Sequence, residues 1–279
     1  TITTGEWVHL AIIYDGVSLK IYINGSEESS ISSILGTLEL NSTDFFIGKN
    51  PAGNLDYLEG YVQEVKVFGK ALTATQLQEQ VYQTIVSNNG NVMGEITSHD
   101  IENLLWSDLK LYLKLTFVED GFTPDASDNN ETNALYNIET IQETTAPLPY
   151  VANASGAWST EGTWEHGDVW DIENLPNKDW SIVQLTNGAS LTSANSHVNL
   201  GLIIDSGCSL TINNDQLLQN TRYLRIDGEI DLNGESQLIQ TETSVLDASS
   251  SGYLERNRPG MGNLYRYNFR SSPVSLINN

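Results

Sequence analysis

The segment from Trp7 to Tyr14 reads Trp-Val-His-Leu-Ala-Ile-Ile-Tyr, and Asp15-Gly16 follows it directly. Aromatic and β-branched residues favour strands, and an Asp-Gly pair after such a run is typical of a hairpin turn. A second run, from Ser18 to Ile23, alternates and ends at Asn24-Gly25, which is another turn signal. The beginning of the chain is therefore predicted to be antiparallel β-structure.

Two further strand-like runs, at residues 45–48 and 61–68, precede a change in the hydrophobic period. From Thr75 to Ile85 the apolar residues recur at helical spacing, and Thr73 stands where a helix cap is expected. We therefore expect an antiparallel sandwich that ends in one short helix.

The same residues resemble the second half of a laminin-G-like, or concanavalin-like, jelly roll. The resemblance is carried by residues 5–11, 14–16, 19–25, 46–49 and 58–73, which match in order and spacing. It extends over residues 1–83. Only the N-terminal strands of that fold are missing, so we expect the chain to be a fragment of a longer protein.

The middle of the chain predicts a connector. Residues 86–104 are polar and read as a linker or link helix, with a short helix near Asp100–Leu105. Residues 109–115 alternate as a strand, and with the loop at 123–130 they resemble the opening of a second laminin-G-like unit. This opening is either a vestige or the completion of a neighbouring sheet. The predicted organisation is a C-terminal half of a jelly roll at 1–85, a linker with an opening strand and loop at 86–150, and a β-rich module at 151–279.

The last module has short apolar strands separated by Gly or Asn, such as Leu202-Ile203-Ile204 and Leu210-Thr211-Ile212. Such short strands with frequent turns favour a right-handed parallel β-solenoid, or else an irregular sandwich. The predicted fold class is therefore all-β: a truncated jelly-roll sandwich, a connector and a solenoid-like module.

Short strings in the last module, such as Val169-Trp170-Asp171-Ile172 and Gly228-Glu229-Ile230-Asp231-Leu232, carry a second resemblance. They resemble very large surface proteins of gliding and marine Bacteroidota. That resemblance implies export by the type IX system and a role in adhesion.

The composition excludes several classes of partner. The chain has 279 residues, with 13 Lys and Arg against 36 Asp and Glu, so its net charge is −23. This balance argues against binding nucleic acid or anionic lipid, because both need clustered basic residues. No apolar run is long enough for membrane insertion. The single cysteine, Cys208, forms no internal disulfide and is expected to be a small buried side chain. All six arginines follow residue 220.

One loop is a candidate metal site. Its pattern is Asp125-x-Ser127-x-Asn129-x-Glu131, and oxygen ligands at alternate positions of a turn can face one calcium ion. In laminin-G-like families a similar loop binds structural calcium together with an Asp of the last strand, where this chain has Gln63. The alternative is a turn stabilised by its own Asx side chains.

Aromatic residues are candidates for glycan contact. Exposed indoles offer flat surfaces to sugar rings, which makes Trp158, Trp164 and Trp170 candidates, although core packing is the usual fate of tryptophan. Tyr265 and Arg266 belong to a basic, aromatic segment that could stack on sugars. The alternative for that segment is a strand whose arginines pair with acids on a neighbouring face.

A catalytic function is not predicted. The segment Gly228 to Glu235 resembles the Glu-x-Asp-x-Glu strand of concanavalin-like glucanases, which place their carboxylates at alternate positions for hydrolysis. In this chain the third position is Asn233, and Glu235 is out of phase. A solvated strand in the solenoid is the alternative interpretation.

We therefore expect a non-enzymatic segment of a large extracellular adhesin on a bacterial cell surface. Its role would be adhesion to a polysaccharide or other glycan, a part in gliding motility, or that of a spacer. Its partners would also include other modules of the same long chain. The alternatives are an accessory carbohydrate-binding region of a secreted polysaccharide-degrading enzyme and a structural component of a surface filament.

Overall fold

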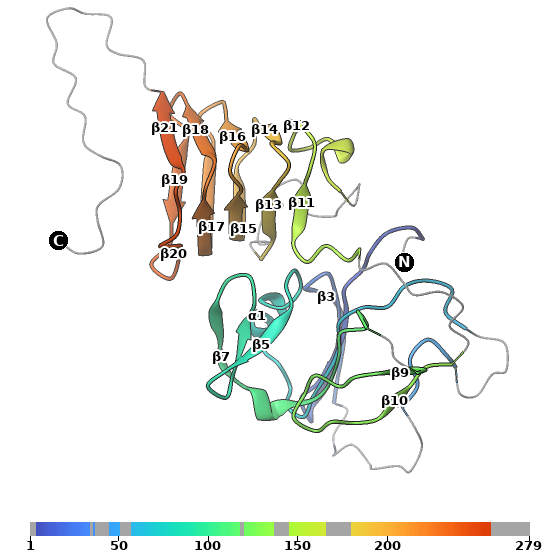
Figure 1. Ribbon diagram of the computed structural model, residues 1–279. Helices are drawn as coiled ribbons and strands as arrows, with labels where there is room; N and C mark the ends of the chain where they lie inside the picture. The colour runs from blue at the N-terminus through green and yellow to red at the C-terminus, as the bar shows by residue number, and fades with distance from the viewer. Residues whose placement is uncertain are drawn as a thin grey trace, which may run out of the picture.

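The structure is a computed structural model that describes residues 4–33, 36, 45–50, 57–117, 120–136, 145–165 and 180–257. Its chain forms two bodies, which we call the N-terminal unit (residues 4–136) and the solenoid (residues 150–257). In Figure 1 the solenoid lies above the N-terminal unit. Nearly all regular elements are strands, so the predicted all-β class is confirmed.

The first sheet of the N-terminal unit is antiparallel, in the order β1 (Leu10–Tyr14), β2 (Ser18–Ile23) and β3 (Ser26–Ser32). Asn24 and Gly25 have φ of 49° and 81° and close a two-residue turn between β2 and β3. Positive φ at both positions is what this hairpin type needs, so the Asn-Gly turn is confirmed. One face of the sheet packs Ile13 and Tyr22 against the following helix.

That helix, α1 (Ala74–Gln78), is shorter than the expected 75–85. Thr73 caps it as predicted: its hydroxyl accepts from the Gln76 amide, and the Gln76 side chain accepts from the Thr73 amide. Beyond Gln78 the chain turns, and the side chains of Gln80 and Gln83 donate back to backbone carbonyls. Backbone bonds from the amides of Gln80 and Val81 to the carbonyls three residues before them form turns in place of the expected helix.

The strand predicted at 61–68 is limited to β4 (Val65–Phe68), because Glu64 adopts a φ of 59° that interrupts an extended run. The run at 45–48 forms no strand, and its neighbour Lys49 makes an isolated bridge to Tyr57.

The expected linker at 86–104 is instead part of a three-stranded sheet, so that prediction and the helix near Asp100–Leu105 are wrong. The strands are β5 (Ile85–Asn88), β6 (Asn91–Gly94) and β7 (His99–Leu105), followed by the 3-10 turn η1 (Trp106–Asp108). Asn89-Gly90, with φ of 49° and 87°, closes the first hairpin. Buried apolar side chains hold the sheet together, namely Ile85, Val92, Ile101 and Leu104.

Residues 109–113 form β8 (Leu109–Leu113), which pairs antiparallel with β4. Of the two interpretations of this strand, the structure therefore shows the completion of a neighbouring sheet. The loop that follows carries a small antiparallel pair, β9 (Phe122–Thr123) and β10 (Asn133–Ala134).

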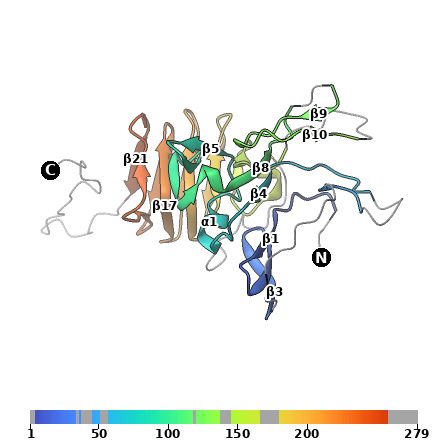
Figure 2. The same cartoon turned by 90° about the horizontal axis from the view of Figure 1, so that it is seen from below.

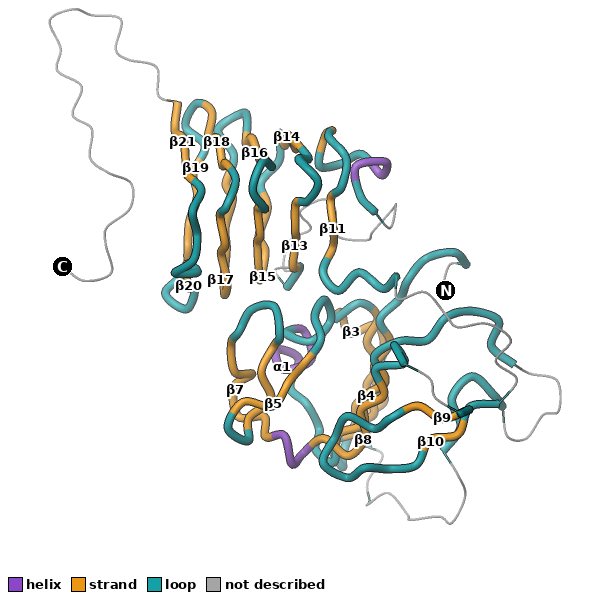
Figure 3. The backbone as a smooth tube through the Cα atoms, in the orientation of Figure 1, coloured by secondary structure: helices purple, strands orange, loops and turns teal. Residues whose placement is uncertain are grey.

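The solenoid consists of two parallel sheets whose strands alternate along the chain from β11 to β19, and the next strand, β20, belongs to the same sheet as β19 (Figure 3). From residue 181 onward, side-chain hydrogen bonds between successive coils join residues 18 to 24 positions apart. The predicted solenoid is thus confirmed. The first sheet contains β11 (Tyr150–Ala152), β13 (Ile182–Leu185), β15 (His197–Ile204), β17 (Leu217–Ile226), β19 (Gln237–Gln240) and β20 (Val245–Leu246). The second contains β12 (Gly156–Ala157), β14 (Ser190–Ser193), β16 (Ser209–Ile212), β18 (Glu229–Asn233) and β21 (Tyr253–Asn257), and the turn η2 (Glu161–Thr163) follows β12.

Columns of apolar side chains fill the interior of the solenoid. Parallel register stacks Leu191, Leu210 and Ile230 on one another, and each of the three has 0% of its surface exposed. Each such side chain contributes about 1.5–3 kcal/mol by burial. Cys208 is buried as predicted.

The two bodies share one core. Val81, Tyr82 and Ile96 of the N-terminal unit belong to the solenoid core, and the rings of Tyr82 and Tyr150 lie 4.6 Å apart. Arg222 of β17 also donates to the Glu79 carboxylate at 2.8 Å. In Figure 2, which is a view from below, α1 and β5 overlap the solenoid strands. In the part of the chain that the structure describes, no helix has the length and hydropathy needed to cross a membrane.

Candidate functional site

The second sheet of the solenoid presents a regular polar surface. Along each of its strands, alternate residues such as Leu210 and Ile230 point into the core, so the residues between them point outward. Parallel register aligns these outward residues in two columns. We call them the outer face: Ser190, Ser209, Glu229 and Tyr253 in one column, and Thr192, Thr211, Asp231 and Glu255 in the other.

Hydrogen bonds connect neighbours within the first column. The Ser209 hydroxyl donates to Ser190 Oγ at 3.0 Å, and the Tyr253 hydroxyl donates to Glu229 Oε2 at 3.0 Å. The ring of Tyr253 is 59% exposed. The outer face therefore combines hydroxyl groups and carboxylates with one exposed aromatic ring.

Asp231 is the outer-face residue with an unused acceptor. Its Oδ1 is buried and has no hydrogen-bond partner among the described residues. Burial, and then the charge of Glu229, raise the pKa of the Asp231 carboxyl. An unpaired buried acceptor is costly, and protein atoms cover this oxygen, so a ligand on the outer face does not reach it in this conformation.

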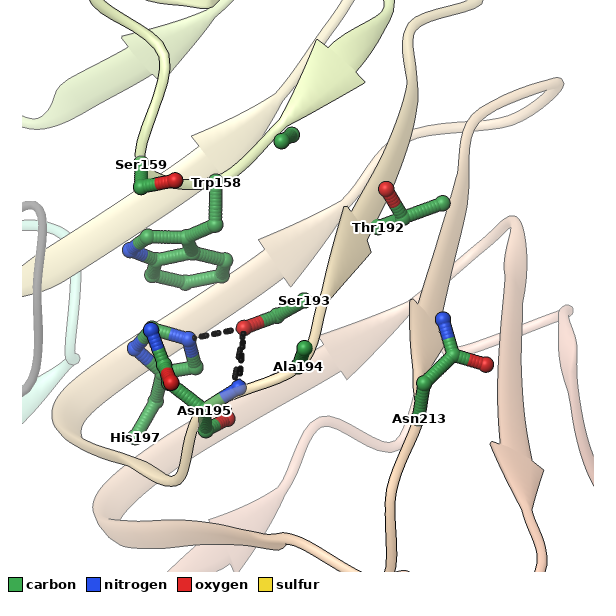
Figure 4. A pocket seen from close by; sticks show the side chains of 9 residues that line it. Trp158, Ser159, Thr192, Ser193, Ala194, Asn195, His197 and Asn213 are labelled. Carbon is green, nitrogen blue, oxygen red and sulfur yellow. Dashed lines mark hydrogen bonds between the residues drawn. The ribbon is translucent and has the colours of Figure 1, made fainter.

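A cavity of about 150 Å³ opens beside the β12–β14 end of the outer face (Figure 4). Its lining includes the outer-face residue Thr192 and the side chains of Asn195 and Asn213. Hydroxyl and amide groups thus line a hollow next to the polar columns.

Of the two roles considered for the indoles, glycan contact and core packing, the structure shows core packing for Trp158 and Trp164. Trp158 and Trp164 are 3% and 5% exposed and meet edge to face at 5.3 Å. Trp158 also stacks on His197 at 4.0 Å. Bulky side chains close the core at the first coils, which explains this burial. Trp170, Tyr265 and Arg266 lie outside the described residues.

A serine and a histidine meet at the wall of the cavity. Ser193 Oγ lies 2.6 Å from His197 Nε2 and accepts a hydrogen bond from the Asn195 amide. Burial lowers the pKa of His197 to about 4, so the imidazole is neutral at neutral pH. Among the described contacts of His197 there is no carboxylate to orient the ring, as a nucleophilic triad would need. The pair stabilises the turn between β14 and β15.

The loop predicted for calcium is closed by its own hydrogen bonds. Asp125 Oδ1 accepts from the amides of Tyr112 and Ser127, and Oδ2 accepts from the Ser127 hydroxyl and the Glu131 amide. The Asn129 side chain donates to the carbonyls of strand β8. Within the described residues, no group of three or more His, Cys, Asp and Glu is placed to hold a metal. Calcium binding by this loop stays a prediction, and the geometry favours the Asx turn.

Calcium dependence has a direct test. Because the Asp125 oxygens already have donors, we expect the melting temperature to be the same with a chelator as with millimolar calcium. A calcium-bound native state would instead be stabilised by about 2.7 kcal/mol at a hundredfold excess over Kd. A rise of several degrees with calcium, measured by differential scanning calorimetry, would establish the ion.

The same loop contributes a pH dependence. Burial alone would raise the pKa of Asp125, but amide donors, that of Ser127 first, outweigh burial and hold the pKa below its ordinary value. A carboxyl with a lowered pKa stabilises the folded state above its unfolded pKa, and this contribution is lost as the pH falls through the folded pKa.

The segment that resembles a glucanase strand lies on β18. Glu229 and Asp231 lie at alternate positions of this strand and face outward, and the following alternate position is Asn233. The Asn233 side chain donates to Asn213 Oδ1 at 2.9 Å. The third carboxylate of the resembled motif is therefore replaced by an amide that links two coils.

Sequence reasoning did not identify the outer face as a site. The signal was present as Ser-Leu-Thr at residues 190–192 and again at 209–211, one coil apart. A repeat of polar-apolar-polar triplets at coil spacing predicts polar columns once the solenoid is assumed.

Comparison with known proteins covers only part of the chain. No curated protein sequence matches it. Among solved structures, it is similar to the crystal structure of an S-layer domain-containing protein from Clostridium thermocellum, with 23% identity and a TM-score of 0.27. That similarity covers 29% of this chain and 42% of the other. Residues 1–78 match the family model Laminin_G_3, described as the concanavalin A-like lectin/glucanases superfamily.

Proposed function

We propose that this protein is a non-enzymatic, extracellular part of a bacterial surface protein and binds polysaccharide through the outer face. The observation that carries the proposal is the pair of polar columns on the second sheet, which end at the exposed ring of Tyr253. The lectin-like match of residues 1–78 supports a surface or carbohydrate-binding role.

The geometry of the outer face suits an extended, repeating ligand. Successive strands of a sheet are about 4.8 Å apart, so each column offers polar groups at a constant interval. Serine and threonine hydroxyls both donate and accept, and the carboxylates accept from sugar hydroxyls. The eight residues of the outer face include three acids and no base, which disfavours a polyanionic glycan.

The biological setting that we propose is adhesion at the cell surface. The resemblance of the last module to surface proteins of gliding Bacteroidota supports type IX export and a part in gliding motility. The match to a lectin/glucanases superfamily also supports a second candidate, an accessory binding region beside a polysaccharide-degrading enzyme. Both candidates use the same outer face for binding.

Replacing Tyr253 by alanine is expected to weaken polysaccharide binding about tenfold, which corresponds to about 1.4 kcal/mol. The variant removes the one exposed ring of the outer face, while the burial of the core residues in β21 is unchanged. Affinity electrophoresis through gels that contain single neutral polysaccharides, such as a β-glucan or a mannan, measures the effect.

Tyr136→Ala is the matched control, because Tyr136 is 80% exposed but lies in the N-terminal unit. In each polysaccharide gel, the Tyr136→Ala variant should be retarded as much as the unmodified protein is. If Tyr253→Ala binds as well as the control, the outer face is not the site. If the unmodified protein is retarded by none of the polysaccharides, only a spacer role remains.

A further inference from the structure

A second cavity lies in the N-terminal unit, away from the outer face. Its volume is about 400 Å³, within the range of pockets that hold small ligands. In Figure 2 the strands that line it, β9 and β10, extend beyond the solenoid strands, on the side of the view opposite β21. We call this cavity the β9–β10 groove, and the residues of its lining that matter here are Phe117, Asp120, Phe122, Thr123, Glu131 and Asn133.

Two phenylalanine side chains line the β9–β10 groove. Phe117 is 56% exposed and Phe122 is 46% exposed. Neither belongs to a hydrophobic core of the part of the chain that the structure describes. Because large apolar side chains gain free energy when they leave water, a ligand that covered both rings would be stabilised by their burial.

Hydrogen bonds connect the walls of the groove. The Thr123 hydroxyl donates to the Phe117 carbonyl at 3.2 Å, and Thr123 pairs with Asn133 across the two strands. On the next segment, the Glu131 amide donates to Asp125 Oδ2 at 3.1 Å. The groove is therefore largely formed before a ligand binds, which lowers the entropic cost of binding.

The groove is also negatively charged. Two carboxylates, those of Asp120 and Glu131, line it, and its described lining contains no basic residue. Neither carboxylate takes part in the ion pairs that the described residues form. Aromatic faces attract cations, and carboxylates form strong hydrogen bonds with them. The groove thus complements a cation that is carried on an apolar stem.

We propose that the β9–β10 groove binds an arginine side chain of a partner protein. A guanidinium group is planar and weakly hydrated, stacks on aromatic rings and can donate two parallel hydrogen bonds to one carboxylate. The apolar stem of arginine can lie along the phenylalanine side chains. A lysine ammonium is a poorer match, because it is strongly hydrated and does not stack. This surface is separate from the outer face and does not depend on glycan binding.

Titration of the full chain with the peptide acetyl-Gly-Gly-Arg-Gly-Gly-amide tests the proposal by nuclear magnetic resonance. We expect saturable shifts of the Thr123 and Asn133 amide resonances, with a dissociation constant on the order of 1 mM, because only a few contacts form. The same peptide with citrulline, which has a similar shape but no charge, should bind about tenfold more weakly. The peptide with lysine should bind about threefold more weakly.

The double variant Asp120→Asn/Glu131→Gln removes both charges and retains the size of both side chains. Asp120 has a φ of 50°, which asparagine also tolerates, so the turn should be kept. We expect the arginine peptide to bind this variant about tenfold more weakly. The control Glu28→Gln/Glu59→Gln removes as many charges from exposed residues outside the groove and should bind as the unmodified protein does. Phe122→Leu keeps an apolar side chain without the ring, and about threefold weaker binding is expected.

The amide of Leu210, in the central strand β16, shows whether each variant is folded. The proposal is wrong if the arginine peptide shifts neither reporter resonance. It is also wrong if the control loses as much affinity as the groove variant, because the net charge of the chain would then explain the binding. Equal affinities for the arginine and lysine peptides would overturn the assignment to arginine. Tyr253→Ala should leave the affinity for the arginine peptide unchanged, so the test is independent of polysaccharide binding.

Discussion

Replacing Trp180 by alanine is expected to lower the free energy of unfolding by about 3–5 kcal/mol, the usual cost of truncating a buried aromatic side chain. Trp180 is 5% exposed and belongs to the solenoid core. Its indole Nε1 donates to the Asn24 carbonyl of the N-terminal unit at 3.1 Å. The ring therefore stabilises both bodies and the junction between them.

The turn beneath Trp180 fits the indole closely. A Cβ atom on Gly25 would lie 2.6 Å from Trp180 Nε1, so only glycine allows this approach. Gln78 of α1 donates to the Gly25 carbonyl at 3.1 Å and fixes the same turn. Without the indole, the N-terminal unit loses a major contact to the solenoid, and we expect the single unfolding transition of the shared core to split into two.

Trp180→Phe is the matched variant for this prediction. It retains an aromatic ring but loses the hydrogen bond, which contributes about 1 kcal/mol. Urea denaturation followed by far-ultraviolet circular dichroism, with proteolysis of residues 4–136 as a second probe, measures both variants. If Trp180→Ala lowers the free energy of unfolding by no more than Trp180→Phe does, the indole does not hold the two bodies together.

Replacing Gly228 by alanine is expected to lower the free energy of unfolding by about 3 kcal/mol, which is at the upper end of the usual effect of overpacking. A Cβ at this position would lie 2.2 Å from the Cys208 carbonyl oxygen and 2.6 Å from that of Asp205. Both oxygens belong to the backbone of the preceding turn, so the clash cannot be relieved by the movement of a flexible side chain. The corner between β17 and β18 would have to separate from the coil before it.

Gly162→Ala is the control, because a Cβ there meets nothing within 4 Å and its φ is ordinary. It should change the melting temperature by little, since surface substitutions usually fall within about 0.5 kcal/mol. For a chain of this size the Gly228 variant should melt roughly 6–12 °C lower. Equal melting temperatures for the two variants would mean that the corner between β17 and β18 accommodates the added Cβ without a loss of stability.

Local signals predicted much of the fold. Asn24-Gly25 marked a hairpin and Thr73 marked a helix cap, because each depends on backbone geometry within a few residues. Short strands between Gly and Asn residues predicted the solenoid, whose every coil repeats the same local arrangement. The jelly-roll resemblance is supported by the family match over residues 1–78.

The errors arose where an element depends on a partner elsewhere in the chain. Residues 86–104 were predicted to be a linker because most of them are polar, although Val92, Ile101 and Leu104 among them are buried in the structure. The Asn89-Gly90 turn was the signal that could have revealed the sheet. The helix after Thr73 ends at Gln78, and turns with i→i−3 backbone bonds follow it, which the period of apolar residues does not distinguish from a helix.

For the candidate site, too, local signals were predicted correctly and contacts between distant residues were not. Sequence identified Glu229 and Asp231 as alternate acids on one strand, but it could not place them beside Thr211 and Glu255, since parallel register across coils aligns residues 20 or more positions apart. It left glycan contact and core packing open for Trp158 and Trp164, and the structure buries both in the first coils.

Short-range backbone preferences and the period of apolar residues were enough to predict most strands, the tight turns and the all-β class. Which side chains face solvent, which lie in the shared core around Tyr82 and Tyr150, and which align in the outer face became visible only in the folded chain. Those outcomes depend on contacts between residues far apart in the chain, and the free energy of burial that selects them is a property of the assembled core.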